Sequence, residues 1–211
     1  MKINLPTKIT VARILLIPIF AALYLIPDPT CQLAATVVFI VAALTDWLDG
    51  YLARRNNMVT NLGKFLDPVA DKVLVACALI LAVFYMPTEG ALGWSRYAIV
   101  ICTVIIVSRE LIITCFRTIA ATKNVIMAAD RLGKMKTVFQ LIGLILLLPY
   151  NAIFTFSEGA GAVFLSGGIA FLQMATAFTI LSAVNYIHKN RHVLGEKGTD
   201  GEKEEKEEKE A

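Results

Sequence analysis

The sequence predicts an all-α, polytopic membrane protein with six transmembrane helices. Of its 211 residues, 57% are hydrophobic and 18% are charged, and the mean hydropathy is +0.66. Apolar runs of about 20 residues, the length that crosses a bilayer as a helix, recur along the chain. Short segments rich in turn-forming residues separate these runs. A chain of this size therefore has room for several membrane spans and for little else.

The first three helices are expected at residues 9–26, 32–54 and 68–86. The first run follows basic residues and contains no small-residue cleavage site, so we expect a retained span and not a signal peptide. A turn-forming segment, PDPT at 27–30, separates the first two helices. Pro68 suits the first turn of the third helix, where a missing N–H is tolerated.

The last three helices are expected at residues 96–120, 132–156 and 161–188. The segment PTEGALG at 87–93 precedes the fourth helix, and SEGAG at 157–161 separates the last two. Both connections carry no Lys or Arg. We find no internal repeat at a fixed period, which argues against a transporter built from inverted repeats.

Basic residues collect at one set of helix ends, whereas at the other set only Arg96 lies at a helix edge. By the positive-inside rule, the basic ends and both termini face the cytoplasm, and we expect a multi-pass membrane protein. The basic set comprises Lys2, Lys8, Arg54, Arg55, Lys64, Lys72, Arg117, Lys123, Arg131, Lys134, Lys136, Lys189 and Arg191.

The C-terminal segment 195–211 (GEKGTDGEKEEKEEKEA) differs in character from the rest of the chain. It holds eight acids and four lysines and no large apolar side chain, which is typical of a disordered, solvated tail. The preceding residues 1–194 carry sixteen Lys and Arg against nine Asp and Glu. We therefore expect a basic membrane domain at 1–194 followed by a disordered charged tail at 195–211.

Four of those nine acidic residues lie close together in the sequence. Asp46 and Asp49 are three residues apart, so they share one face of their helix. Asp67 and Asp71 are four residues apart and share a face of the next helix. A helix rising from Gln32 reaches Asp46 after about 21 Å, just inside the cytoplasmic surface. Four carboxylates so close would repel one another unless Mg²⁺ or Mn²⁺ supplies balancing charge, and all-oxygen ligands suit these ions.

The residues between the aspartates indicate what such a metal serves. Gly50, Ala53 and Gly63 are small and allow a bulky group to approach the backbone. Arg54 adds a planar donor that suits phosphate oxygens. A metal, small residues and an arginine at a membrane surface favour a phosphate-bearing lipid as substrate, with the cation stabilising charge on phosphorus oxygens and on the leaving group.

These eight residues match the pattern DxxDGxxARx8Gx3Dx3D at every fixed position, and with them the chain resembles the CDP-alcohol phosphatidyltransferase family. The resemblance implies that an acceptor hydroxyl attacks the β-phosphorus of a CDP-linked lipid, CDP-diacylglycerol, and that CMP leaves. It also implies a homodimer surrounded by membrane lipids, and we expect no nucleic acid partner. The implied roles are one or two metal ions on Asp46, Asp49, Asp67 and Asp71, Asp71 as the catalytic base, and Gly50, Arg54 and Gly63 at the nucleotide.

Three further segments resemble the bacterial branch of this family whose acceptor is sn-glycerol 3-phosphate: 4–20, 108–121 and 133–140. An anionic acceptor needs cations beside the metal. Arg109 is the most informative, because an arginine about 13 residues into an apolar helix is costly unless it faces a polar cavity or pairs with a neighbour such as Glu110. The candidate residues for the acceptor phosphate are Arg109, Arg117, Arg131 and Lys134.

Several alternatives stay open at this point. The acceptor could be inositol phosphate, serine or phosphatidylglycerol. A divalent-cation transporter would also place acids in its helices, although near the midplane, and a non-catalytic membrane scaffold would tolerate loss of Asp71. The positive-inside bias with snorkelling explains basic helix ends in any membrane protein. The residues alone separate neither a metal ligand from a base among the four aspartates nor a direct displacement from one through an enzyme intermediate.

Overall fold

The chain forms a bundle of helices, with no strand in the part that the structure describes. The structure is a computed structural model that describes residues 5–56, 61–87, 93–122 and 131–189, without the side chains of 5–9, 46–56, 61–68, 71, 118–122, 131 and 189. The helices are α1 (Leu5–Leu25), α2 (Pro29–Asn56), α3 (Asn61–Phe84), α4 (Trp94–Thr122), α5 (Arg131–Leu147), α6 (Tyr150–Phe156) and α7 (Glu158–Lys189).

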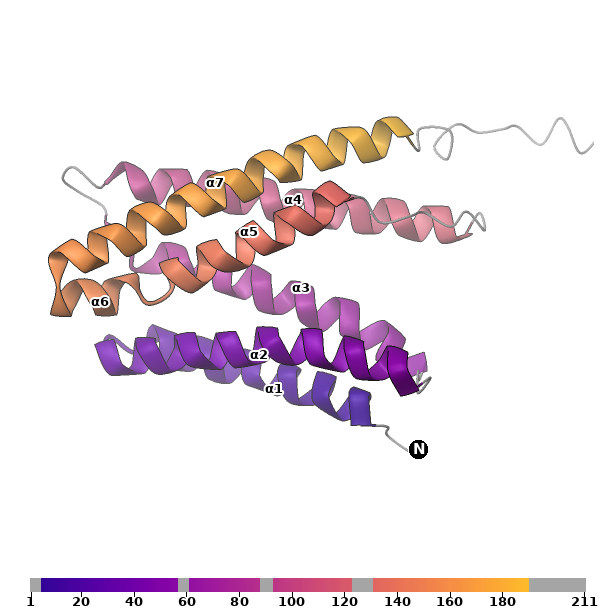
Figure 1. The fold of residues 1–211 in the computed structure, drawn as a ribbon, viewed down its shortest axis with the longest axis horizontal. Helices are drawn as coiled ribbons and strands as arrows, with labels where there is room; N and C mark the ends of the chain where they lie inside the picture. Colours follow the sequence, from indigo (N-terminus) through magenta and orange to yellow (C-terminus); the bar gives the residue numbers. More distant parts are fainter. Residues whose placement is uncertain (1–4, 57–60, 88–92, 123–130, 190–211) are drawn as a thin grey trace, which may run out of the picture.

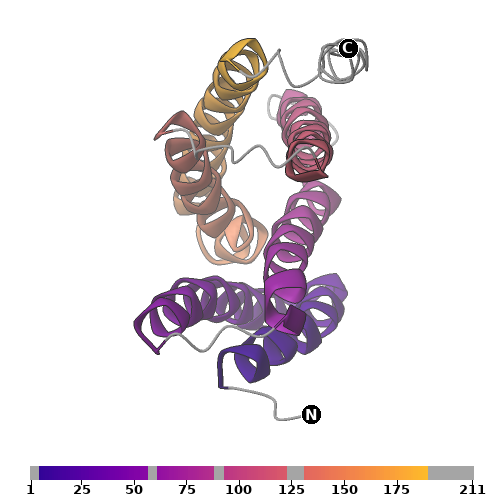
Figure 2. The ribbon, with the colours of Figure 1, turned by 90° about the vertical axis from the view of Figure 1, so that its right-hand side faces the viewer.

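Successive long helices run in opposite directions (Figure 1). The start of α1 and the end of α7 lie at the same end of the bundle, together with the ends of α2 and α4 and the starts of α3 and α5. Viewed from that end, α1, α2 and α3 form one group and α4, α5 and α7 another, and α3 reaches across to α4 (Figure 2). The helix ends that carry most of the basic residues therefore meet, as expected; their assignment to the cytoplasm stays a prediction.

Two helix boundaries differ from the expected ones because of proline. The third helix begins at Asn61, seven residues before Pro68, since a membrane-type helix accommodates an internal proline, as α1 does at Pro18. The helix expected over 132–156 is instead two helices, α5 and α6, which meet at Pro149. Proline lacks an N–H and disfavours helical geometry in the residue before it, so the chain turns there.

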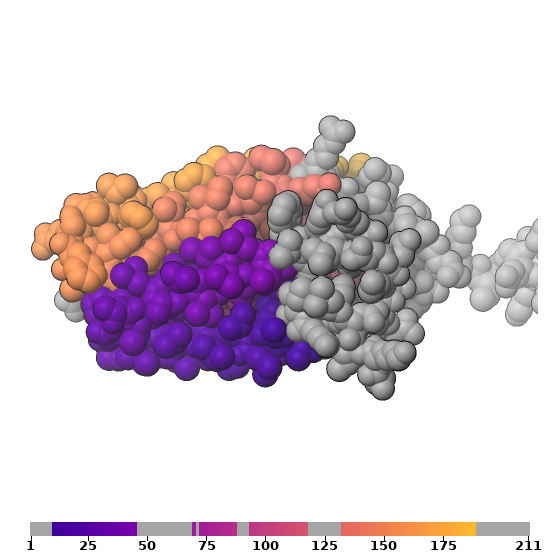
Figure 3. Space-filling model, turned by 60° about the horizontal axis from the view of Figure 1, so that its bottom comes forward, coloured from indigo at the N-terminus to yellow at the C-terminus, as the bar shows by residue number. Residues whose placement is uncertain are grey.

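The short helix α6 lies at the opposite end of the bundle from the start of α1 and the end of α7. The Tyr150 hydroxyl donates to the carbonyl oxygen of Tyr85 at 2.5 Å, and the Asn151 amide donates to Gln32 Oε1 at 3.0 Å. Figure 3 shows the α6 region packed directly over the beginning of α2. These bonds satisfy polar groups that would otherwise be costly in an apolar environment, and they join the two helix groups.

Small residues let α5 and α7 approach closely. A Cβ on Gly168 would lie 2.6 Å from Leu147 Cγ, and a Cβ on Gly143 would lie 3.2 Å from the carbonyl oxygen of Gly168. Gly161 is equally restricted, because its Cβ would lie 2.5 Å from Phe154 Cα. In a bilayer the lipid tails are as apolar as the helix surfaces, so the hydrophobic effect does not drive helices together. Close backbone packing of this kind stabilises their association instead.

The outer surface of the bundle is apolar. Large hydrophobic side chains are exposed on each of the long helices, among them Leu15, Val37, Ile80, Ile101 and Val163. Among the described residues, three helical stretches are long and apolar enough to cross a membrane, Trp94–Arg117, Leu132–Phe156 and Glu158–His188, and three shorter apolar stretches are Thr10–Leu25, Pro29–Thr45 and Lys72–Phe84. The all-helical prediction is thus confirmed for the described residues, and their apolar helices are consistent with a membrane protein, whereas the six crossings stay a prediction.

Candidate active site

The segments that carry the four aspartates lie at the end of the bundle where α2 finishes and α3 begins (Figure 1). Asp46 and Asp49 belong to the last three turns of α2, and Asp67 and Asp71 to the first three turns of α3. Their side chains, like those of Arg54 and Arg131, are outside the described set, as are the surroundings of Gly50 and Gly63. The fold therefore brings the expected ligand segments to one end of two packed helices, while the roles of these residues stay predictions.

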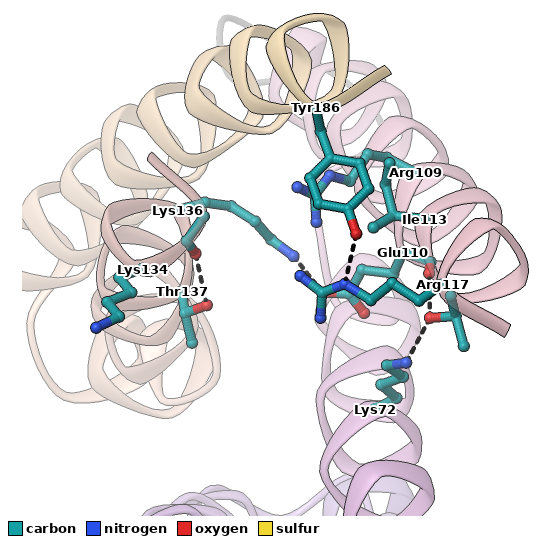
Figure 4. Close-up of a pocket in the computed structure, with 11 residues that line it drawn as sticks. Lys72, Arg109, Glu110, Ile113, Arg117, Lys134, Lys136, Thr137 and Tyr186 are labelled. Carbon is teal, nitrogen blue, oxygen red and sulfur yellow. Dashed lines mark hydrogen bonds and ion pairs between the residues drawn. The ribbon is translucent and has the colours of Figure 1, made fainter. Parts of the chain in front are cut away.

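A cationic pocket of about 250 Å³ opens at the same end of the bundle (Figure 4). It lies between four helices, α3, α4, α5 and α7. Five of its lining residues are basic and one is acidic, so the pocket has an excess of positive charge that suits an anion. The lining residues are Lys72, Arg109, Glu110, Ile113, Thr114, Arg117, Gly133, Lys134, Lys136, Thr137 and Tyr186.

Side chains of α7 hold the two arginines of α4. Arg109 Nη2 donates to Ser182 Oγ at 2.8 Å, and Arg117 Nε donates to Tyr186 Oη at 3.2 Å. The guanidinium carbon of Arg117 also lies 5.4 Å from the centre of the Tyr186 ring. Contacts within the protein thus orient both guanidinium groups at the pocket, which lowers the entropic cost of binding an anion there.

A second set of contacts joins α3, α4 and α5. The Lys72 ammonium donates to Thr114 Oγ1, and the Thr114 hydroxyl donates to the carbonyl oxygen of Glu110 at 2.6 Å. The Glu110 carboxylate forms an ion pair with Lys136, whose side chain is almost fully buried. These bonds connect the beginning of α3 to α4, and α4 to α5.

Three of the four residues expected at an acceptor phosphate line this pocket: Arg109, Arg117 and Lys134. The Lys134 ammonium points away from Lys136 and Arg117 in Figure 4, so in this arrangement it contributes to the rim. The fourth, Arg131, is the first residue of α5, and its side chain is outside the described set. The partner considered for Arg109, Glu110, instead forms its ion pair with Lys136.

Sequence reasoning did not select Lys72, Lys136 and Tyr186 for the site. Both lysines were present among the basic helix ends, but so are many lysines that only face the membrane surface. Lys136 lies four residues before Gln140 on one face of α5, and both side chains are buried, but only the structure shows that this face is the buried one.

Arg13 of α1 is also buried, with 1% of its surface exposed. It shares a helix face with Ile17 and Phe20, which belong to the core between α1, α2 and α3. A buried guanidinium in the first half of α1 adds positive charge to the helix group that carries the aspartates, and the sequence left its helix face undecided.

The donor set of the aspartate segments fits a hard divalent ion. Carboxylate oxygens are the only side-chain ligands that the pattern offers there, and Mg²⁺ and Mn²⁺ prefer such ligands. No group of three potential metal ligands occurs among the described side chains, which do not include these four. The placement of both helix segments at the same end of the bundle is the structural observation that supports a metal site.

Comparisons with known proteins indicate the same family that the sequence pattern resembles. Residues 3–185 match the family model of CDP-alcohol phosphatidyltransferase. The CDP-diacylglycerol–glycerol-3-phosphate 3-phosphatidyltransferase of Bacillus subtilis is 40% identical over 203 residues, covering 90% of this chain and 97% of the relative. The Escherichia coli K12 protein of that name is 38% identical, with coverage of 90% and 97%, and an Arabidopsis thaliana protein (number 2 of that name) is 35% identical, with coverage of 91% and 82%.

Proposed function

Because the chain belongs to the CDP-alcohol phosphatidyltransferase family, we propose that it transfers the phosphatidyl group of CDP-diacylglycerol to sn-glycerol 3-phosphate and releases CMP. The relatives that share most of its length carry this activity in their names. The structural observation that carries the proposal is the cationic pocket, which lies at the same end of the bundle as the aspartate segments. The family membership also removes the grounds for a cation transporter or a scaffold.

The proposed reaction needs a base, a phosphate site and a nucleotide site. The hydroxyl oxygen of the acceptor attacks the β-phosphorus, the bond from that phosphorus to the oxygen of CMP breaks, and the hydroxyl proton passes to the Asp71 carboxylate. Gly50 and Gly63 leave room for the nucleotide, and Arg54 contributes a fork donor to its phosphates.

Asp46, Asp49, Asp67 and Asp71 would hold one or two Mg²⁺ or Mn²⁺ ions. Such an ion neutralises the carboxylates and the negative charge on the phosphorus oxygens. Support comes from the match of all eight fixed positions in the sequence pattern and from the location of the end of α2 and the start of α3 at the same end of the bundle.

The acceptor phosphate would bind in the cationic pocket through Arg109 and Arg117, with Lys134 at the rim and Arg131 at the start of α5. An acceptor without a phosphate would leave these cations uncompensated, which disfavours serine. Inositol phosphate and phosphatidylglycerol also carry phosphate, so the charge of the pocket alone distinguishes them least from sn-glycerol 3-phosphate.

A panel of acceptors tests the proposal. Purified protein in detergent with CDP-diacylglycerol and Mg²⁺ should release CMP with sn-glycerol 3-phosphate and much more slowly with inositol phosphate, serine or phosphatidylglycerol. Asp71→Asn should release almost none with any acceptor, because it cannot take up the proton. Release that depends on another alcohol and not on glycerol 3-phosphate would refute the acceptor assignment.

We further propose that the protein crosses the bacterial cytoplasmic membrane six times, with the pocket and both termini on the cytoplasmic side, and that it works as a homodimer. Support for the crossings is the apolar surface on all long helices and the clustering of basic helix ends. A soluble acceptor and a soluble product, CMP, are then exchanged with the compartment that the pocket faces.

A further inference from the structure

Glu110 is the one acidic residue among the eleven that line the cationic pocket, all of which lie in helices that the structure describes. A carboxylate repels the phosphate that such a pocket is built to bind. Its presence there lowers the affinity for an anion, so a benefit to the protein must offset this cost.

The position of Glu110 indicates that benefit. Its carboxylate is paired with the Lys136 ammonium, and only 19% and 5% of the two side chains are exposed. Lys136 extends from α5 across the pocket toward α4 (Figure 4). The helix position of Glu110 is itself held, because its carbonyl oxygen accepts the Thr114 hydroxyl at 2.6 Å.

A buried lysine in an apolar bundle is costly unless an anion accompanies it. When a phosphate occupies the pocket, it can be that anion. When the pocket is empty, Glu110 is the only lining residue with a negative charge. The ion pair thus balances the charge of Lys136 and holds its side chain inside the pocket between turnovers.

We propose that Glu110 is an internal counter-ion, which pairs with Lys136 in the empty pocket and yields that lysine to the phosphate of the incoming acceptor. Lys136 is then a specificity-determining residue. A ligand must carry a strong anion to take the ammonium from Glu110, and a neutral alcohol cannot do so. The inference rests on the proposed function for the identity of the acceptor, whereas the exchange itself concerns any phosphate.

The exchange is tested by measuring the binding of inorganic phosphate to the purified full-length protein by isothermal titration calorimetry. Glu110→Gln keeps an oxygen that can accept from Lys136 but removes the competing charge, so phosphate should bind about tenfold more tightly. Lys136→Met should bind phosphate about tenfold more weakly. The matched control is Glu158→Gln, which removes one acid from the exposed start of α7 and should leave the affinity unchanged.

Equal or weaker phosphate binding in Glu110→Gln would overturn the proposal, because a purely structural role predicts a looser pocket. Glu110→Asp offers a second test if Glu110→Gln does not fold: the shorter carboxylate loosens the pair, and phosphate should bind about threefold more tightly. Unchanged binding in that variant would also overturn the proposal. If the wild-type protein binds phosphate but no acceptor gives CMP release, the proposed function fails while the binding data still decide the role of Glu110.

Discussion

Removal of the Tyr186 hydroxyl tests whether Arg117 contacts the acceptor. Tyr186→Phe deletes the 3.2 Å hydrogen bond from Arg117 Nε to the Tyr186 hydroxyl. It keeps the ring, which packs edge-on against Phe116 with 6.0 Å between the ring centroids. A hydrogen bond to a charged group contributes about 1.5–3 kcal/mol. This one is long and Arg117 is exposed, so we expect a loss of about 1 kcal/mol in the affinity for the acceptor phosphate.

That loss corresponds to an increase of about fivefold in the KM for sn-glycerol 3-phosphate. The kcat should stay within about twofold, because the interaction is equally present in the ground state and the transition state. The assay is CMP release at saturating CDP-diacylglycerol and Mg²⁺. Tyr97→Phe is the matched control, since Tyr97 is exposed near the opposite end of α4. A drop in kcat at unchanged KM, or an equal effect of Tyr97→Phe, would show that Arg117 does not bind the acceptor.

The remaining predictions concern packing, metal and tail. Gly168→Ala should lower the unfolding free energy by about 1–3 kcal/mol, because the new methyl group would overlap the Leu147 side chain, whereas Gly159→Ala on the same helix meets no atom within 4 Å and should be neutral in the same thermal unfolding assay. Chelation should abolish CMP release, with recovery on Mg²⁺ or Mn²⁺ and poor recovery on Ca²⁺; full activity in chelator would exclude a metal-assisted reaction. Deletion of 195–211 should leave kcat/KM within about twofold, and a larger loss would mean that the tail contributes to the site.

The helix pattern could be predicted because the length of apolar runs depends only on composition along the chain. The two misplaced boundaries both involve proline, whose effect depends on surroundings. Pro68 is accommodated inside α3, whereas at Pro149 the chain turns and α6 finds partners in Tyr85 and Gln32. Those partners are more than 60 residues away in sequence, so local sequence signals could not reveal the turn.

The candidate site was predictable to the extent that its chemistry follows a fixed spacing or a general charge bias. Arg109 was selected because of its cost in an apolar helix, and it lies in the pocket. Lys136 could not be distinguished from other basic helix ends, because only the packing of α5 against α7 and α3 decides which face of α5 is buried. The pairing of Glu110 with Lys136 has the same origin.

Lys72 places the cationic pocket next to the aspartate segment of α3. It immediately follows Asp71 in α3, and its ammonium donates to Thr114 of α4 inside the pocket. A displacement at phosphorus requires the acceptor hydroxyl, the metal-bound phosphate and the base within contact distance, so the acceptor pocket must open beside the carboxylates. A pocket whose wall begins one residue after the proposed base meets this requirement. A cationic pocket at the α6 end of the bundle would have met the charge requirement equally well and could not have served the reaction.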